Sequence, residues 1–139
     1  MTPQQIELIK SSFAKVAPIS ETAAELFYGR LFTLDPKLKP LFKGDMKEQG
    51  RKLMAMLATS VANLNNLGSI IPTVEALGRR HNDYGVKPKD YQTVAEALLW
   101  TLEQGLGDAF TPDVKQAWTE CYVTLANVMQ QAAVEKASA

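Results

Sequence analysis

The sequence is poor in the residues that build disulfides and metal clusters. Its 139 residues contain one cysteine, Cys121, and one histidine, His81. A single cysteine excludes an internal disulfide and a zinc site of the multi-cysteine kind, and its place in an apolar stripe indicates a buried, inert thiol. No apolar run approaches the ~20 residues needed to span a bilayer, and no basic segment followed by an apolar one opens the chain. We therefore expect no membrane association and a cytoplasmic protein.

The chain also lacks an excess of charge and the common signatures of enzymes. Fifteen basic and fifteen acidic residues give a formal net charge of zero, so nothing argues for a nucleic-acid partner. There is no glycine-rich phosphate loop, no evident Ser/His/Asp arrangement and no histidine-rich metal motif. The length suits one domain, which we place at residues 1–139.

What the sequence does contain is a repeated set of helix-start signals, with no strand pattern. Thr2-Pro3-Gln4-Gln5 combines a capping hydroxyl, a proline at the first helical position and a glutamine three residues after the cap. Related signals predict an all-α fold of six long helices and one short one, the long ones beginning near residues 2, 20, 45, 69, 88 and 111 and the short one spanning 35–41. The sharp corners between some of them indicate helices that cross at steep angles around a pocket.

His81 lies where one of these helices runs out. Steps of four, three and four residues back from it reach Leu77, Val74 and Ile70, an apolar stripe at helical spacing. Tyr84-Gly85 is expected to end the helix soon after. A histidine on the inward face at this point is suited to bind a cofactor, but it equally suits a structural role at the negative end of the helix dipole. The pattern alone leaves both interpretations open.

Two other polar residues interrupt apolar helix faces. Gln49 begins the inward stripe of its helix, and Tyr28 lies within the inward stripe of an earlier one. Buried glutamine and tyrosine side chains need hydrogen-bond partners. Those partners are either the protein's own backbone and side chains or a small polar ligand held in an otherwise apolar cavity.

From about Gln5 to Met129 the sequence resembles the globins. Asp35-Pro36 followed by Pro40-Leu41-Phe42 is similar to the globin corner, whose phenylalanine packs on the haem. Arg79-Arg80-His81, followed after two residues by Tyr84-Gly85-Val86, is similar to the segment that carries the iron-binding histidine. The closest resemblance is to the branch of bacterial flavohaemoglobins and single-domain bacterial haemoglobins.

The resemblance implies one haem b and a role for each matching residue. His81 would be the proximal iron ligand, Tyr28 and Gln49 the distal pair that faces the bound gas, and Tyr91 a contact of the histidine. Lys52, Arg80 and Lys87 are candidate partners of the haem propionates, with a solvated surface as the plain alternative. The remaining residues expected to wall the haem are apolar: Phe42, Leu53, Leu77, Val86 and Val94.

The resemblance also implies a function. Ferrous iron would bind O2, CO or NO, and hydrogen bonds from Tyr28 and Gln49 would give high O2 affinity, for oxygen binding and transport or NO scavenging. The enzymatic alternative is a nitric oxide dioxygenase that uses a separate reductase. A haem-free helical signalling domain is a third possibility, which a Soret band would exclude. We expect a monomer.

Two departures from the family pattern matter. Only six residues separate Phe42 from Gln49, so the small helix that many globins carry there is expected to be absent. Flavohaemoglobins place a glutamate eleven residues after the tyrosine matched by Tyr122, where this chain has Ala133, and Glu135 lies about 200° further round a helix. Without that carboxylate the histidine would push less electron density onto iron, which favours binding over catalysis.

Overall fold

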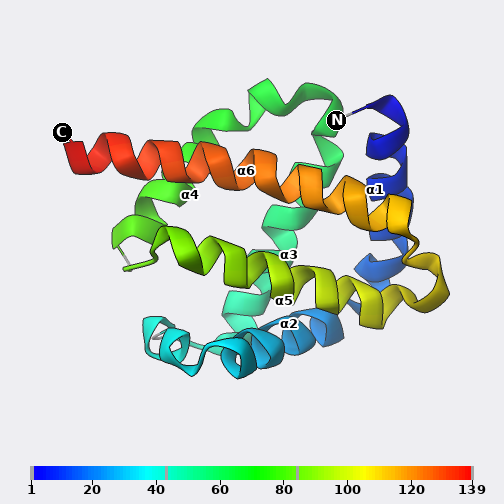
Figure 1. The fold of residues 1–139 in the computed structure, drawn as a ribbon, viewed down its shortest axis with the longest axis horizontal. Helices are drawn as coiled ribbons and strands as arrows, with labels where there is room; N and C mark the ends of the chain where they lie inside the picture. Colours follow the sequence, from blue (N-terminus) through cyan, green and yellow to red (C-terminus); the bar gives the residue numbers. More distant parts are fainter. Residues whose placement is uncertain (1, 43, 84, 139) are drawn as a thin grey trace.

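The described residues form six α-helices, with short 3-10 segments in all the connections except that between α4 and α5 (Figure 1). This computed structural model describes residues 2–42, 44–83 and 85–138. The α-helices are α1 (Pro3–Val16), α2 (Ser20–Leu34), α3 (Met46–Ala62), α4 (Ile71–Asp83), α5 (Pro88–Leu106) and α6 (Pro112–Ser138). The 3-10 segments are η1 (Ala17–Ile19), η2 (Pro36–Leu41), η3 (Leu64–Ser69) and η4 (Gly107–Ala109). The described ranges hold no strand, and the predicted six long helices and one short one, η2, are confirmed.

Side-chain caps explain where several helices begin. At α1 the Thr2 hydroxyl accepts from the Gln5 backbone N–H at 3.1 Å, and the Gln5 side chain accepts from the Thr2 N–H at 2.9 Å. Asp35 caps η2 through the Lys37 N–H at 3.1 Å. Each cap satisfies backbone donors that have no partner within the helix, and each falls where the sequence predicts one.

The segment before α4 differs from the prediction. The sequence predicts a helix that begins near residue 69, but the chain forms η3 there and α4 begins at Ile71. The Ser69 hydroxyl donates to the Asn66 carbonyl at 2.8 Å, and the Ile70 N–H donates to the Leu67 carbonyl at 3.0 Å. These local bonds favour a tight 3-10 turn over an extended loop. Among the described residues between Phe42 and α3 there is no helix, as the spacing predicts.

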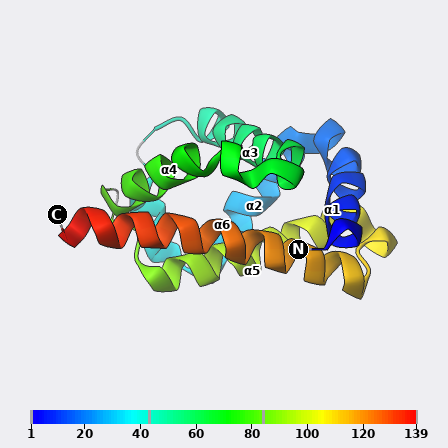
Figure 2. The ribbon, with the colours of Figure 1, turned by 90° about the horizontal axis from the view of Figure 1, so that it is seen from above.

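The helices cross steeply, in two groups. In Figure 1, α5 and α6 run side by side while α3 crosses behind them. Figure 2 shows α3 and α4 on one side of the molecule and α5 and α6 on the other. The main packing partners of α6 are α1, α4 and α5, whereas α2 packs on α3 and α5. None of the helices in the described ranges has the length and apolarity to cross a membrane.

A buried side-chain hydrogen bond joins α6 to α1 within the core. Trp118 on α6 is 1% exposed, and its indole Nε1–H donates to the Ser12 hydroxyl on α1 at 2.8 Å. That hydroxyl in turn donates to the Leu8 carbonyl at 2.7 Å. Because the indole donor is satisfied, a large aromatic side chain is buried without leaving an unpaired polar group.

Candidate functional site

The first part of the site is an aromatic cluster between α2, η2 and α3. The ring of Tyr28 lies 5.0 Å from Phe27 and 5.3 Å from Phe42, both edge-on, and is stacked at 6.1 Å on Phe32 (centroid distances). Its hydroxyl reaches the backbone carbonyl of Gln49 at 3.5 Å, a long hydrogen bond. The structure therefore brings together Tyr28, Phe42 and Gln49, which we call the distal cluster.

The hydroxyl of Tyr28 is a permanent donor at neutral pH. The residue is only 8% exposed, and burial raises its pKa to about 12, more than the contact with Gln49 lowers it. A phenol in an apolar surrounding keeps its proton because the charged form is poorly solvated. It can therefore donate a hydrogen bond to an electron-rich atom placed beside it.

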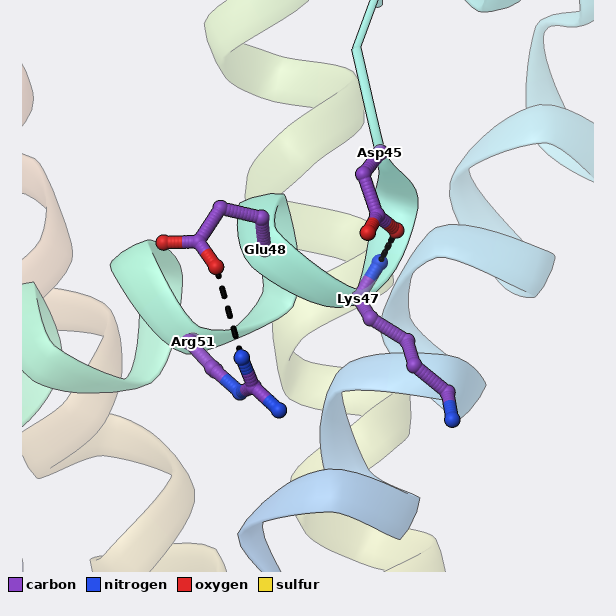
Figure 3. A network of polar contacts seen from close by, with 4 residues as sticks. All are labelled: Asp45, Lys47, Glu48 and Arg51. Atoms are coloured by element: carbon purple, nitrogen blue, oxygen red, sulfur yellow. Dashed lines mark hydrogen bonds and ion pairs between the residues drawn. The ribbon is translucent and has the colours of Figure 1, made fainter.

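A close helix crossing holds the distal cluster. A Cβ built on Gly50 of α3 would lie 3.0 Å from the Cβ of Ala24 on α2, so the two helices approach as closely as small residues allow. Ala24 lies one helical turn before Tyr28, and Gly50 directly follows Gln49. The start of α3 is fixed as well, since Asp45 accepts from the Lys47 N–H at 2.9 Å (Figure 3).

Glu48 lies in the first turn of α3 but does not complete a capping box with Asp45. Its carboxylate pairs with Arg51 at 3.3 Å, as Figure 3 shows. Both side chains are largely exposed, so this i,i+3 pair is worth at most a few tenths of a kcal/mol, about 0.2–0.5. Asp45 therefore carries the cap on its own.

The second part of the site surrounds His81, which is half-buried near the end of α4. Its Nδ1 lies 2.8 Å from the Leu77 carbonyl, so Nδ1 carries the proton and the lone pair of the neutral ring is on Nε2. Burial lowers the pKa of His81, the bond to Leu77 raises it, and the Arg80 charge lowers it. The imidazole is thus held neutral and in one tautomer, which is the form that ligates metals.

The end of α4 fixes the backbone of His81. The Val86 N–H donates to the His81 carbonyl at 3.0 Å across Gly85, whose φ is +90°. This bond between residues five apart, closed through a left-handed glycine, is the Schellman arrangement that ends helices. A Cβ on Gly85 would lie 3.8 Å from Leu41 Cδ2, so the corner also rests against η2. Tyr84, expected to help end this helix, lies outside the described residues.

Gly78 lets α4 lie directly on α6. A Cβ at this position would be 2.7 Å from the carbonyl carbon of Met129 and 2.5 Å from its Cα. Carbon atoms at their best separation are about 3.5–4.0 Å apart, so only glycine permits this contact. Since Gly78 precedes His81 by three residues, the α4–α6 crossing also sets where the imidazole lies.

Tyr91 of α5 completes this second part. The rings of His81 and Tyr91 are 6.4 Å apart, and Tyr91 is 8% exposed. The Tyr122 hydroxyl on α6 donates to the Tyr91 backbone carbonyl at 2.7 Å. Sequence reasoning missed that bond, although a tyrosine on the inward face of its helix signals the need for an acceptor. We call His81, Tyr91 and Tyr122 the proximal cluster.

The other predicted site residues lie outside the two clusters or join them only through backbone hydrogen bonds to His81, as Leu77 and Val86 do. Leu53 and Val94 are half-buried against the core, and Leu53 also lines a small apolar cavity that reaches Trp118. Lys52, Arg80 and Lys87 are exposed, and among the described side chains they form no ion pair. Leu77 and Val86 are half-buried on either side of His81. The side chain of Ala133 lies outside the described residues.

The sequence was also compared with known proteins. The family model for the globins matches residues 25–129. The chain belongs to the globin family. Relatives include a flavohemoprotein of Bacillus subtilis, 37% identical over 125 residues, and one of Vibrio cholerae, 32% identical over 131 residues. These alignments cover 88% and 92% of this chain but only 31% and 33% of the relatives, so this globin spans about a third of their length.

A solved structure confirms the fold independently. RmaNOD from Rhodothermus marinus, studied as an engineered carbene transferase, superposes with a TM-score of 0.91 over 99% of this globin and 96% of its own chain. Its sequence is 22% identical, so this likeness concerns the fold alone. The predicted globin fold and the predicted likeness to flavohaemoglobins are confirmed.

Proposed function

We propose that this globin binds one haem b, whose iron His81 would hold through Nε2. The chemistry of the donor supports this: the imidazole is neutral, its Nδ1 proton is committed to the Leu77 carbonyl, and its lone pair is on Nε2. When a histidine ligates a metal, a hydrogen bond from its other ring nitrogen fixes the orientation of the ring and tunes its basicity. When bound, haem supplies a ferrous iron that takes up diatomic gases reversibly.

In this proposal Tyr28 and Gln49 form hydrogen bonds to the bound gas. A buried, protonated Tyr28 hydroxyl is a donor held beside Gln49, and its long bond to the Gln49 carbonyl is weak enough to exchange for a better acceptor. With haem in place, the Tyr28 hydroxyl would donate to the gas, and it would favour O2, the more electron-rich acceptor, over CO. Each bond is worth about 1–3 kcal/mol in a dry pocket, which predicts slow O2 release.

The apolar residues contribute by excluding water. Phe42 packs edge-on against both Tyr28 and Phe32, and Leu53 and Val94 lie half-buried on neighbouring helices. A wall of this kind strengthens hydrogen bonds inside the pocket because the local dielectric is low. It also keeps solvent protons from promoting oxidation of ferrous iron. Contacts of Lys52, Arg80 and Lys87 with the propionates, a monomeric state and a cytoplasmic location remain predictions.

The function that the site supports best is high-affinity binding of O2, with CO and NO as further ligands. The observation that carries it is the Tyr28 hydroxyl, buried, protonated and placed against Gln49. Replacing Tyr28 with phenylalanine keeps the ring contacts and removes the donor, and we expect O2 to dissociate at least tenfold faster, equivalent to about 1.4 kcal/mol. Stopped-flow displacement of O2 by CO measures the rate. An unchanged rate would refute the assignment of Tyr28.

A second candidate is the conversion of NO and O2 to nitrate with electrons from a separate reductase. It is favoured by the flavohemoproteins among the relatives. Ala133 offers no carboxylate to increase the basicity of His81, and this favours binding or scavenging of NO over its catalytic conversion. Steady-state NO consumption with a flavin reductase and NADH decides: sustained turnover supports the enzyme, and a single stoichiometric burst supports binding.

A further inference from the structure

A groove runs along the outer side of α2, beside α5. Its volume is about 310 Å³, and its lining mixes an aromatic ring, two charges and small residues: Trp100, Arg30, Glu25, Leu26, Gly29 and Thr33. Ligand pockets in proteins begin at about 300 Å³ and combine apolar walls with a few polar groups. The groove is large enough for a small molecule, and it lies away from both clusters described above.

Arg30 is the unusual residue in this groove. Its guanidinium lies over the Trp100 ring, with Cζ 5.1 Å from the ring centroid, and its Nε is sealed from solvent without a hydrogen-bond acceptor. Within the described ranges no carboxylate lies within ion-pair distance of it. The sealed Nε–H is out of a ligand's reach, but among the described residues no ion pair or hydrogen bond engages the other N–H groups of the guanidinium. Two such N–H groups match a carboxylate in two-point geometry, so they leave Arg30 with capacity for an anion.

The middle of the groove is open and apolar. A Cβ built on Gly29 would meet nothing within 4 Å, so the missing side chain makes the hollow. Leu26 is half-buried and lies one turn before Arg30, and Trp100 forms the opposite wall. The Thr33 hydroxyl is already committed to the Gly29 carbonyl at 2.8 Å and cannot donate to a ligand at the same time. The apolar surface of Leu26 and Trp100 therefore lies directly beside the charged guanidinium of Arg30.

Glu25 restricts the charge of any occupant. Its carboxylate is exposed and lines the same groove, so a second negative charge on a ligand would be repelled there. A ligand with one carboxylate and a planar apolar body satisfies every feature of the lining. One anionic end would pair with the Arg30 fork, and the ring would lie on Trp100 and Leu26.

We propose that this groove is a binding site for small aromatic monocarboxylates. The groove is separate from the distal and proximal clusters, because none of its lining residues belongs to either. Arg30 supplies the charge-assisted hydrogen bonds, Trp100 the stacking surface and Gly29 the space.

The test uses phenylacetate as the probe and the purified full chain. Titration is followed by ¹H–¹⁵N NMR at the Trp100 indole N–H, with the buried Trp118 indole, already bonded to Ser12, as an internal control. We expect saturable shifts at Trp100 only, with a Kd in the millimolar range or below. The neutral phenylacetamide and the ringless acetate are expected to bind at least tenfold more weakly. Absence of saturable binding, or equal binding of phenylacetamide, overturns the proposal.

Two variants locate the site and one controls for net charge. Arg30→Gln should weaken phenylacetate binding at least tenfold, and Gly29→Leu, whose Cβ would meet nothing within 4 Å and whose branched end would occupy the groove, should abolish it. Arg51→Gln removes an exposed arginine on α3 and should leave the Kd within twofold. Far-UV circular dichroism checks folding, and if Arg30→Gln is misfolded, Gly29→Leu decides alone. Wild-type affinity in either groove variant refutes the site.

Discussion

Replacing Gly78 with alanine tests whether the α4–α6 contact positions His81. The added Cβ would lie 2.5 Å from Met129 Cα and 2.7 Å from its carbonyl carbon, both atoms of the α6 backbone. Backbone atoms cannot rotate away as a side chain can. The two helices must therefore separate by about 1 Å at their crossing to restore ordinary contact distances of about 3.5–4.0 Å.

Two opposing effects determine how much Gly78→Ala changes the free energy of unfolding. Alanine is favoured over glycine within a helix by about 1 kcal/mol. Overpacking costs about 1–3 kcal/mol, and the upper end applies to Gly78 because the clash is with backbone. The expected net loss is about 2 kcal/mol in the free energy of unfolding. At about 2.1 cal/mol/K per residue, this lowers the Tm of a chain of this length by about 7 °C.

The matched control is Gly29→Ala, the same chemical change at a helical glycine with open space around it. There only the helix-propensity effect operates, and Tm should rise by up to about 3 °C. Thermal unfolding followed by far-UV circular dichroism measures both variants. Transfer of haem to an excess of apomyoglobin should also be faster for Gly78→Ala, because α4 carries His81. A Gly78→Ala protein as stable as wild type would refute this reasoning.

The remaining predictions concern the histidine, the thiol and the proximal cluster. With His81 as the chain's one histidine, the ferrous protein without gas should be five-coordinate; a six-coordinate low-spin absorption spectrum would contradict this. Burial raises the pKa of the Cys121 thiol from 9.0 to about 11, so the native protein should react with a disulfide reagent at pH 7.5 about 100-fold more slowly than the unfolded chain, and equal rates would show an exposed thiol. Tyr122→Phe removes the donor to the Tyr91 carbonyl and should lower the free energy of unfolding by about 1 kcal/mol in urea titrations, whereas no loss would mean that water replaces the bond.

The helices were predictable because their start signals are local. Thr2 with Gln5, Asp35 and Asp45 cap helices within two or three residues of themselves, so the sequence carries the whole interaction. The 3-10 segment at Leu64–Ser69 was not predicted. Asparagine and glycine suit both a loop and a tight turn, and the choice depends on where α3 and α4 must meet.

The candidate site was only partly predictable. Periodicity placed Tyr28, Gln49 and His81 on inward faces, and the structure puts Tyr28 against Gln49 through the Gln49 backbone carbonyl. Their roles toward haem came from the family resemblance and remain proposals. The Tyr122–Tyr91 bond could not be predicted, because it joins residues 31 apart whose helices meet only in the tertiary structure.

Each part of the site also depends on a close helix crossing at a glycine. Gly50 on the Cβ of Ala24 fixes α3 against α2 beside Gln49, and Gly78 on the backbone of Met129 fixes α4 against α6 one turn before His81. An added carbon at either glycine would push the two helices apart and move the site residue with them. Exchanging the polar group on Tyr28 leaves these crossings intact. Tyr28→Phe should therefore change gas affinity with little change in Tm, whereas substitutions at Gly50 and Gly78 should change both together.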